Sequence, residues 1–428
     1  MSKTPREMYK ERYNRVMDTI ALKEPDRVPI TPGLSFYPFE VKGLSKQEAM
    51  YDLEKAAEVF KEVLIPLNWD LMPPLLGIYP GKLFDIFGAK FYKWPGAADE
   101  NQRLNPDLPF QYVEGEYMKS DEYEEFFTDP TGFLLKKVIP RQFSNLGGYS
   151  SFPDFSSLIS GLGLIYSMSA FHGMPSGKKI RDTFQEAGQY FFKYASIGSK
   201  YEKDIKKLGF PTGISAVSSA PFDVIGDNLR GMQGIMLDMY RRPEELKKLT
   251  EMVVIGQVEK AVKVAKMSPK NNIVFLALHR GSDEFMNLKQ FEEFYWPSLC
   301  SVLEGLINNN LIPLPFFEGS YDNRLEYLKD FAKKFKGKMI YWFDRTNIFK
   351  AKEILGNYAC LRGNIPGSLM VAGTPFQVEE YVKKCIEICG EGGGYMVDGG
   401  ISGIPDNSNP QNVKAMTDAV FKYGNYHK

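Results

Sequence analysis

The hydrophobic pattern of the chain becomes regular after about residue 210, where short apolar runs alternate with stretches of helical spacing. Two earlier runs, at 27–31 and 69–76, have the same character, and the second is stopped by Pro73-Pro74. Together these runs predict eight strands, near residues 27, 69, 212, 273, 312, 339, 359 and 394. Continuous apolar strands alternating with helices are typical of a parallel sheet that is covered on both faces.

Helices are expected between most of these strands. The predicted helices are 45–67, 120–127, 178–208, 243–267, 288–309, 323–335, 348–355, 375–389 and 410–423. Eight strand–helix units predict an α/β protein of the (β/α)8 TIM-barrel type, with residues 1–428 as a single barrel domain. The alternative is an open doubly wound sheet, which favours a glycine-rich phosphate fingerprint after the first strand. The sequence there, TPGLSFYP, is not such a fingerprint.

The rhythm is interrupted at 80–207, which we interpret as a large irregular insertion, or cap, after the second strand. Segments 91–94 and 110–114 predict a hairpin, and 144–175 is rich in Gly, Ser, Phe and Pro with little charge. Aromatic residues make up 14% of the chain, and many lie in this cap or near Phe316, Phe317 and Trp342. This distribution predicts an apolar chamber suited to a flat or aromatic substrate.

Charge and composition exclude several classes of protein. Lys and Arg number 53 and Asp and Glu also 53, so the chain has no basic excess for binding nucleic acid or a membrane surface. No apolar run is long enough to span a bilayer, and the first residues do not form a signal peptide. The four cysteines include no C-x-x-C pair, which favours a reduced, cytoplasmic protein. Cys385 and Cys389 share a helix face, as core thiols or, alternatively, as metal ligands.

Ionisable residues follow six successive predicted strands, where a barrel carries its active site. They are Asp223, His279 with Arg280, Glu318, Asp344 with Arg345, Arg362, and Asp398. His279, Glu318 and Asp344 come from neighbouring strands about 5 Å apart, so one ligand could contact all three. A histidine with two carboxylates can bind Zn(II) or Fe(II), or can transfer protons without a metal. Polar residues after strands are also common as simple helix caps.

A second group of these residues is suited to binding the substrate. Arg280, Arg345 and Arg362 could hold a substrate carboxylate through two hydrogen bonds each, or could pair with neighbouring acidic residues. Trp342 is a candidate pocket wall, and Asp398 precedes Gly399-Gly400 at the end of the last strand. We therefore predict substrate binding by these five residues and catalysis by the histidine and the two carboxylates of the first group.

Several motifs resemble the uroporphyrinogen decarboxylase superfamily. They are ALKEPDRVPI, GDNLRGMQGIMLDMYRRPEEL, QFEEFYWPSL, and the C-terminal series GNIPGSLMVAGTPFQVEEYV, GGGYMVDGG and NPQNVKAM. The resemblance covers roughly 210–425 and the first strand with its helix, and it is weak from 80 to 207. It implies a (β/α)8 barrel that is usually dimeric, which agrees with the strand count.

The superfamily has a decarboxylase branch and a corrinoid-linked methyltransferase branch. The decarboxylase pattern has an arginine-bearing motif after the first strand and an aspartate at the end of the second. Here residues 31–36 contain no arginine, and Asp70 sits too early in the second strand. Coenzyme M methyltransferases use an H-x-C-G zinc motif with a later cysteine. This chain has Phe316-Phe317-Glu318-Gly319 there, with Cys360 near the later cysteine.

The resemblance therefore implies a methyltransferase that works with a separate corrinoid protein, whose cobalamin accepts or donates the methyl group. A methoxylated aromatic is a candidate substrate, with His279, Glu318 and Asp344 binding zinc or protonating the leaving group. The alternatives are a cofactor-independent decarboxylase or lyase for a small carboxylated substrate, and a binding protein without activity.

Overall fold

A parallel sheet forms the centre of the protein in the computed structural model, which describes residues 3–267, 272–400 and 403–426. Its six strands lie in the order β4-β5-β6-β7-β8-β9. Their bounds are Ala216–Ser219, Ile273–Leu278, Ile312–Phe317, Ile340–Phe343, Cys360–Arg362 and Tyr395–Met396. All neighbouring pairs in this sheet are parallel. Six of the eight predicted strand positions are thereby confirmed.

The two remaining predicted strands join the edges of this sheet through backbone hydrogen bonds. Ile30 forms a parallel bridge with Val397, next to β9, and its carbonyl accepts from the N–H of Asp70. Met72 forms a parallel bridge with Thr212, just before β4. The six strands and these two segments follow one another as a ring, the arrangement of a (β/α)8 barrel.

The strands alternate between an inner and an outer face, as the period of two requires. Leu314, Phe316, Ile340, Trp342 and Cys360 belong to a buried cluster inside the ring. Val16 and Ile20 of helix α1 (Pro5–Ile20) join that cluster, so α1 closes one end of the barrel. Residues of opposite parity belong to the large core between strands and helices; they include Leu276, Leu278, Phe317, Tyr341, Phe343 and Leu361.

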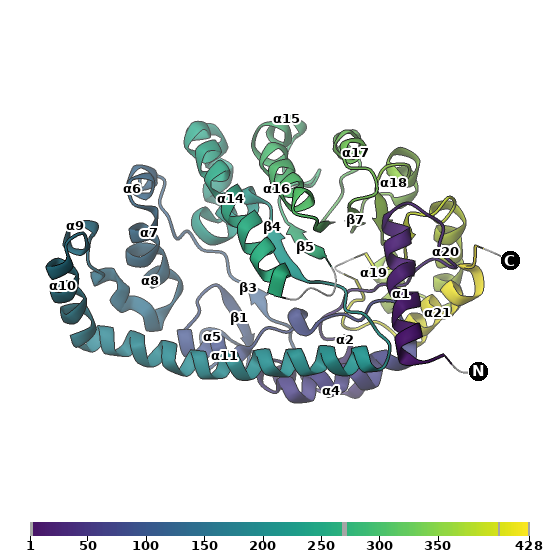
Figure 1. The fold of residues 1–428 in the computed structure, drawn as a ribbon, viewed down its shortest axis with the longest axis horizontal. Coiled ribbons are helices and arrows are strands. Elements are labelled where there is room, and N and C mark those ends of the chain that lie inside the picture. The colour runs from purple at the N-terminus through teal and green to yellow at the C-terminus, as the bar shows by residue number, and fades with distance from the viewer. Residues whose placement is uncertain (1–2, 268–271, 401–402, 427–428) are drawn as a thin grey trace.

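Helices cover the outside of the ring (Figure 1). Those that follow the strands are α12 (Pro221–Ile225), α13 (Gly231–Arg241), α14 (Pro243–Met267), α15 (Leu288–Gln290), α16 (Trp296–Asn308), α17 (Leu325–Lys334), α18 (Ile348–Leu355), α19 (Gly367–Ala372), α20 (Pro375–Cys389) and α21 (Pro410–Tyr423). Cys385 and Cys389 of α20 are fully buried, as core thiols would be. Among the residues described, no helix is both long and apolar enough to span a membrane.

The predicted helix at 45–67 is broken. After α2 (Tyr37–Lys42), the chain forms α3 (Lys46–Tyr51), α4 (Leu53–Leu64) and a 3-10 turn, Ile65–Leu67. Asp52 ends α3, and its side chain accepts a hydrogen bond from the N–H of Lys55 at the start of α4. The periodic apolar pattern continues through this position, so periodicity alone could not reveal the break.

The segment between the second strand and β4 contains a small sheet and many helices. The sheet has the order β2-β1-β3, with bounds Arg103–Leu104, Tyr92–Pro95 and Gln111–Tyr112, and β1 pairs with β3 antiparallel, as the predicted hairpin requires. The helices and turns are η2 (Leu75–Gly77), α5 (Gly81–Phe87), α6 (Tyr123–Thr128), α7 (Pro130–Phe133), η3 (Leu134–Val138), α8 (Ile139–Gln142), η4 (Ser144–Ser151), α9 (Phe155–Leu158), α10 (Gly161–Gly173) and α11 (Pro175–Lys207).

Residues 144–175 of the cap contain two regular helices, α9 and α10. These two helices sit at the end of the molecule opposite both termini, beside the beginning of α11 (Figure 1). Tyr149, Phe152 and Phe171 pack in a small separate cluster there, while Phe155 and Tyr166 are 70% and 71% exposed. These cap aromatics therefore do not build the apolar chamber predicted from their number.

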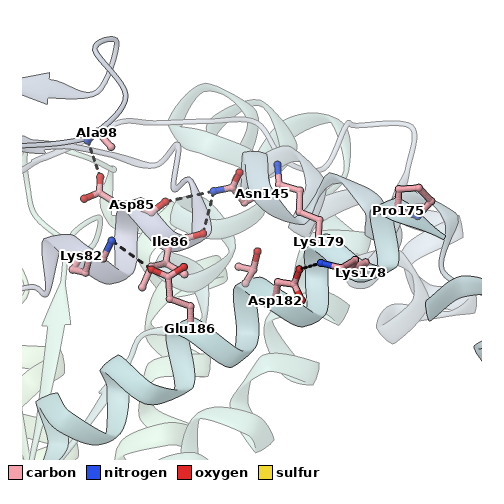
Figure 2. Close-up of a pocket in the computed structure, with 11 residues that line it drawn as sticks. Lys82, Asp85, Ile86, Ala98, Asn145, Pro175, Lys178, Lys179, Asp182 and Glu186 are labelled. Atoms are coloured by element: carbon pink, nitrogen blue, oxygen red, sulfur yellow. Dashed lines mark hydrogen bonds and ion pairs between the residues drawn. The ribbon is translucent and has the colours of Figure 1, made fainter. Parts of the chain in front are cut away.

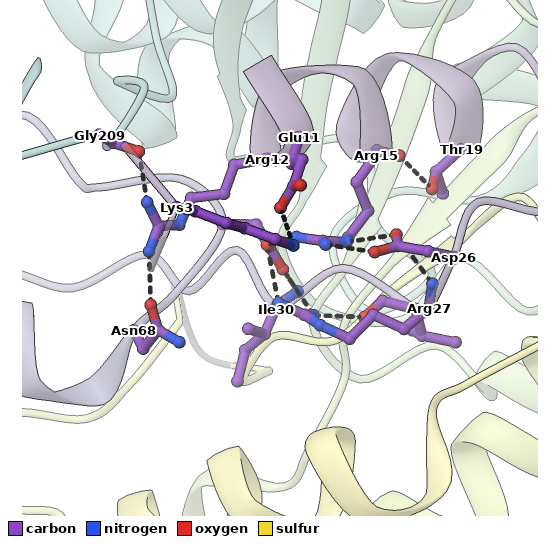
Figure 3. Close-up of polar contacts among 12 residues, drawn as sticks. Lys3, Glu11, Arg12, Arg15, Thr19, Asp26, Arg27, Ile30, Asn68 and Gly209 are labelled. Carbon is purple, nitrogen blue, oxygen red and sulfur yellow. Dashed lines mark hydrogen bonds and ion pairs between the residues drawn. The ribbon is translucent and has the colours of Figure 1, made fainter. Parts of the chain in front are cut away.

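A buried charge cluster ties α1 to the first two barrel segments (Figure 3). The fully buried Asp70 carboxylate accepts from Arg27 at 2.8 and 2.9 Å, from the Ile30 N–H at 2.9 Å, and from Arg15. Arg15 also binds the exposed Asp26. Asp70 lies at the start of its segment, near the end of the barrel that α1 closes. Its position supports the expectation that it is too early to be the aspartate of the decarboxylase pattern.

Thr374 caps α20 and gives a testable contribution to stability. Its hydroxyl accepts from the Gln377 N–H, and the Gln377 side chain accepts in return from the Thr374 N–H. We expect Thr374→Ala to lower the free energy of unfolding by about 1 kcal/mol, because the first turn loses this partner. Denaturant unfolding measures the change, and Thr374→Ser is the matched control. An equal loss in both variants would contradict a role for the hydroxyl.

Candidate functional site

The register of the strands places one layer of polar side chains at the carboxyl end of the barrel. Ala277 pairs with Phe316, Phe316 with Trp342, Trp342 with Arg362, and Arg362 with Met396. The residues two positions further along the chain follow directly on the ends of these strands, at the carboxyl end of the barrel. They are His279, Glu318, Asp344, Asn364 and Asp398, which we call the rim layer.

His279 and Glu318 form the closest pair in this layer. Nδ1 of His279 lies 2.8 Å from Oε2 of Glu318, and Nε2 lies 3.9 Å from the Asp227 carboxylate. Burial opposes protonation of the imidazole, but the Glu318 hydrogen bond and the charges of Asp223 and Asp227 outweigh it and raise the pKa of His279 to about 9. Both side chains remain about half exposed, at 44% and 52%. The pair therefore offers a protonated imidazole to a ligand at neutral pH.

Asp223 holds the backbone that carries His279. This fully buried carboxylate, at the start of α12, accepts from the N–H of His279 at 3.0 Å and of Arg280 at 3.1 Å. The Tyr295 hydroxyl donates to it at 2.7 Å. Burial raises the pKa of Asp223, although its donors and the nearby positive charges oppose that rise. Asp223 and Tyr295 are thus positioning residues for the histidine.

The cap reaches this side of the rim through the β1–β3 hairpin. The Tyr112 hydroxyl donates to the Asp227 backbone carbonyl at 2.6 Å. Burial, together with the Asp227 charge, raises the pKa of Tyr112. Arg280 turns toward the same place, where it binds the Asp227 carboxylate at 2.7 Å and lies 3.7 Å from Asp223. Arg280 is therefore held by carboxylates of its own chain.

Asp344 is bound on one side only. Its Oδ2 accepts from the Gly319 N–H at 3.0 Å, whereas its Oδ1 is buried without a hydrogen-bond partner. Gly319 has a φ of +83°, and a β-carbon there would meet Ser282 at 2.8 Å, so glycine suits this turn. Burial raises the pKa of Asp344 despite the Gly319 hydrogen bond. An unpartnered buried acceptor of this kind suits a donor group on a ligand.

Arg345 and Arg362 have different surroundings. Arg345 is 65% exposed and lies 3.1 Å from Glu284. Arg362 is buried inside the barrel, where its Nε donates to Asp398 at 2.8 Å and its guanidinium lies 4.0 Å from the centre of the Trp342 ring. All three predicted carboxylate-binding arginines are thus paired with acidic residues. Their contact with a substrate stays a prediction.

Asp398 is the most deeply buried acid of the rim layer. It is fully buried and accepts from the N–H of Gly33 at 3.2 Å and of Gly399 at 2.6 Å, as well as from Arg362. Burial raises the pKa of Asp398 to about 6, although Arg362 and the backbone donors oppose that rise. The Trp342 indole donates to the Gly399 carbonyl at 3.3 Å, which fixes the wall beside this pair.

The expected metal-ligand set does not form in this arrangement. Glu318 is hydrogen-bonded to His279, while Asp344 accepts from the Gly319 backbone. Within the described residues, no group of three His, Cys, Asp or Glu side chains is arranged to hold a metal ion. Cys360 lies inside the barrel, where burial raises its pKa and keeps it as a thiol. These residues therefore do not fit a zinc site.

A separate cavity of about 540 Å³ lies between α5 and α11 in the cap (Figure 2). Two ion pairs lie in its walls, with Lys82 3.4 Å from Glu186 and Lys178 2.6 Å from Asp182. None of the rim-layer residues lines it. It therefore contributes nothing to the chemistry at the barrel end.

Sequence reasoning brought His279 and Glu318 together correctly but overlooked several neighbours. Tyr295 and Tyr112 come from a helix and a hairpin, and no local pattern indicates that they reach the rim. Asn364 donates to the backbone carbonyls of Asp344 at 2.9 Å and of Thr346 at 2.6 Å. Its place in the GNIP motif is the one signal that could have identified it.

The raised pKa of His279 predicts the pH at which the site changes charge. We expect this imidazole to stay protonated at pH 7 and to lose its proton near pH 9. Because the folded pKa exceeds the ordinary value of 6.5, the pair stabilises the fold fully below pH 6.5 and ceases to do so as the pH rises through about 9. NMR titration of 13C-labelled histidine measures this, with His279→Gln assigning the signal. Titration near 6.5 would contradict the pairing, and Glu318→Gln should lower the pKa.

Comparison with known proteins places this barrel in a family. The family model described as "Uroporphyrinogen decarboxylase (URO-D)" matches residues 185–423, more than half of the chain. A barrel with an ionisable layer at its carboxyl end is the general architecture of a barrel enzyme. The chain belongs to the uroporphyrinogen decarboxylase family.

Individual relatives are distant. The chain is 24% identical to the uroporphyrinogen decarboxylase of Francisella philomiragia over 62% of this chain and 74% of that protein. It is 22% identical to that of Klebsiella pneumoniae over 57% of this chain and 66% of that protein. A solved methyltransferase from Methanosarcina mazei has a TM-score of 0.61 with 14% identity, over 99% of each chain. That structural likeness establishes the fold.

Proposed function

We propose that this protein is a methyltransferase that transfers a methyl group between a small substrate and a separate corrinoid protein. The observation that carries the proposal is the His279–Glu318 pair, half exposed at the barrel end, in which a pKa raised to about 9 keeps the imidazole protonated at neutral pH. A corrinoid supplies the nucleophile, Co(I), so the protein itself has to supply only binding and a proton. The fold shared with the Methanosarcina mazei methyltransferase supports this.

In the proposed reaction the substrate is a methoxylated aromatic. The methyl–oxygen bond breaks, the methyl carbon bonds to cobalt, and the oxygen keeps the bonding electron pair as a phenolate. His279 donates its proton to that oxygen, which makes the leaving group a neutral phenol. Glu318 stabilises the imidazolium before transfer, and Asp223 and Tyr295 hold its backbone and orientation. The unpartnered Oδ1 of Asp344 would accept a hydrogen bond from a substrate donor.

The same proposal includes a partner protein, a cellular location and an assembly. The corrinoid protein would deliver its cofactor to the barrel end, beside the rim layer. The four cysteines are free in the structure, three of them buried, which suits the reducing cytoplasm that Co(I) chemistry requires. A homodimer, which the family resemblance implies, is the proposed assembly.

A decarboxylase is the second candidate, favoured by the Asp398–Arg362 pair. Arg362 could release Asp398 to bind a substrate carboxylate, and the buried Asp398, with a pKa of about 6, could then protonate the carbanion left after loss of carbon dioxide. The curated relatives are decarboxylases by name. Their first-strand arginine motif, however, has no counterpart at residues 31–36.

The test mixes the purified protein with free cob(I)alamin and a panel of methoxybenzoates, and follows the cobalamin absorbance. Conversion to methylcobalamin that depends on both protein and substrate is the expected result. Release of carbon dioxide with no cobalamin present would contradict the proposal and support the second candidate. Protein with His279→Gln is the matched control for background methylation.

A further inference from the structure

Arg362 has hydrogen-bonding capacity that its own chain does not use. Its side chain is only 8% exposed, and among the described residues it donates to Asp398 alone, from Nε at 2.8 Å. A guanidinium carries five N–H groups, so four remain on Nη1 and Nη2. These two atoms still reach water, whereas Nε of Arg280 is buried without a partner. Arg362 therefore presents a fork of unused donors that a ligand can reach.

The surroundings of Arg362 hold this fork in one place. Its guanidinium lies 4.0 Å from the centre of the Trp342 ring, and stacking on an aromatic face leaves the N–H groups at the guanidinium edge free. The Trp342 indole is itself fixed by its hydrogen bond to the Gly399 carbonyl. The fully buried Tyr395 donates to the carbonyl of Gly363, the next residue along β8, at 2.6 Å. The fork is thus preorganised, which lowers the entropy cost of binding an anion.

The other two arginines near the rim layer are less suited to this role. Arg280 donates to the Asp227 carboxylate at 2.7 Å and has a second carboxylate within 3.7 Å. Arg345 is 65% exposed, where water competes with any bound anion. Arg362 shares its charge with Asp398 alone, and its planar fork matches the two oxygens of a carboxylate. Among the three, Arg362 is therefore the best carboxylate ligand.

Arg362 reaches the rim layer on the side opposite His279. It contacts Asp398, which follows β9, whereas His279 follows β5. In the ring of strands and strand-like segments, β9 and β5 are four positions apart and therefore face each other across the barrel. A flat ring with a carboxylate at one end and the reacting group at the other end fits this arrangement.

We infer that Nη1 and Nη2 of Arg362 bind a carboxylate of the substrate, so that the preferred substrates are aromatic acids whose carboxylate stands para to the group that reacts at His279. The inference rests on the proposed function, which identifies the reacting group as a methoxyl. The bond from Nε to Asp398 persists, and the carboxylate is an anchor that the reaction leaves intact. In the decarboxylase alternative, by contrast, Arg362 releases Asp398 and the carboxylate is lost.

Isothermal titration without any cobalamin tests this site separately from the reaction. The unmodified chain should bind para-methoxybenzoate at least about thirtyfold more tightly than the uncharged para-methoxybenzamide, because charge-assisted hydrogen bonds are about twice as strong as neutral ones. Arg362→Gln should reduce this preference to about threefold or less, since glutamine has no charge and no fork. Arg242→Gln, between α13 and α14 and 43% exposed in the unmodified chain, is the matched control and should keep the preference.

A double variant keeps the test valid if Arg362→Gln does not fold. That substitution leaves the buried Asp398 without its counter-charge, whereas Arg362→Gln combined with Asp398→Asn removes both charges of the pair. The double variant should also lose the preference for the acid. Equal affinity of the unmodified chain for the two compounds, or no binding of the acid, would overturn the inference. An unchanged preference in a folded variant without Arg362 would do the same.

Methyl transfer to cob(I)alamin then separates this inference from the proposed function. The kcat/KM of para-methoxybenzoate should exceed that of ortho-methoxybenzoate at least about tenfold, because neighbouring groups cannot reach both sides of the barrel at once. Equal values for the two isomers would overturn the para placement of the carboxylate. Binding that depends on the carboxylate and on Arg362, with no methyl transfer, would support the carboxylate site and contradict the proposed reaction.

Discussion

Replacing His279 with Gln lowers the rate of methyl transfer from a methoxybenzoate to cob(I)alamin by about 100- to 10,000-fold. This is the usual contribution of a positioned general acid, and glutamine keeps the size and polarity of the side chain without its exchangeable charge. Single-turnover kinetics under saturating substrate measure the loss. His172→Gln, on α10 and far from the rim layer in the sequence and fold, is the control and leaves the rate unchanged.

The nature of the leaving group separates proton donation from a structural role. Demethylation of a nitro-substituted methoxybenzoate releases a stable phenolate, which needs little help from an acid. The loss of rate caused by His279→Gln should therefore shrink at least tenfold with this substrate. A deficit of equal size with both substrates would contradict proton donation and indicate that His279 only shapes the site.

Replacing Asp70 with Ala lowers the free energy of unfolding by about 3–5 kcal/mol. The carboxylate is fully buried and neutralises Arg15 and Arg27. Its removal leaves both guanidinium groups, near the closed end of the barrel, without this negative charge. The Ile30 N–H also loses its acceptor, which loosens the junction between the first two barrel segments. Chemical denaturation followed by circular dichroism measures the change.

Asp26→Ala provides the matched control for this prediction. Asp26 binds the same Arg15, but its side chain is 63% exposed, so its loss should cost less than about 1 kcal/mol. Equal effects of the two substitutions would show that burial does not determine the strength of this cluster. Neither residue belongs to the rim layer, so the rate of the folded Asp70→Ala variant should stay close to normal.

Much of the barrel could be predicted from the sequence because its strands are continuous apolar runs bounded by polar residues. The run at 273–278 became β5, and the helix at 375–389 was predicted with both ends correct, since Thr374 and Pro375 are strong start signals. His279 and Glu318 could be paired because strand ends of a parallel barrel meet at one edge. These inferences need only local patterns and one topological rule.

The predictions that failed, and the site neighbours that were overlooked, depend on contacts between segments that are distant in the sequence. Tyr112 reaches Asp227 across 115 positions of the sequence, and Tyr295 reaches Asp223 across 72. The hydrophobic periodicity does not indicate that the Asp344 carboxylate accepts from the Gly319 N–H instead of joining His279 and Glu318 as a metal ligand. The aromatic residues of 144–175 were counted correctly, but their composition could not reveal that Phe155 and Tyr166 face outward.

One doubly labelled substrate tests the central claim most directly. The protein is incubated with cob(I)alamin and a methoxybenzoate that carries 13C in its methoxyl group and 14C in its carboxyl group. The account predicts a 13C-methyl signal on cobalt, a demethylated phenol that retains all 14C, and no labelled carbon dioxide. Release of 14C-labelled carbon dioxide with the methoxyl group intact would contradict it.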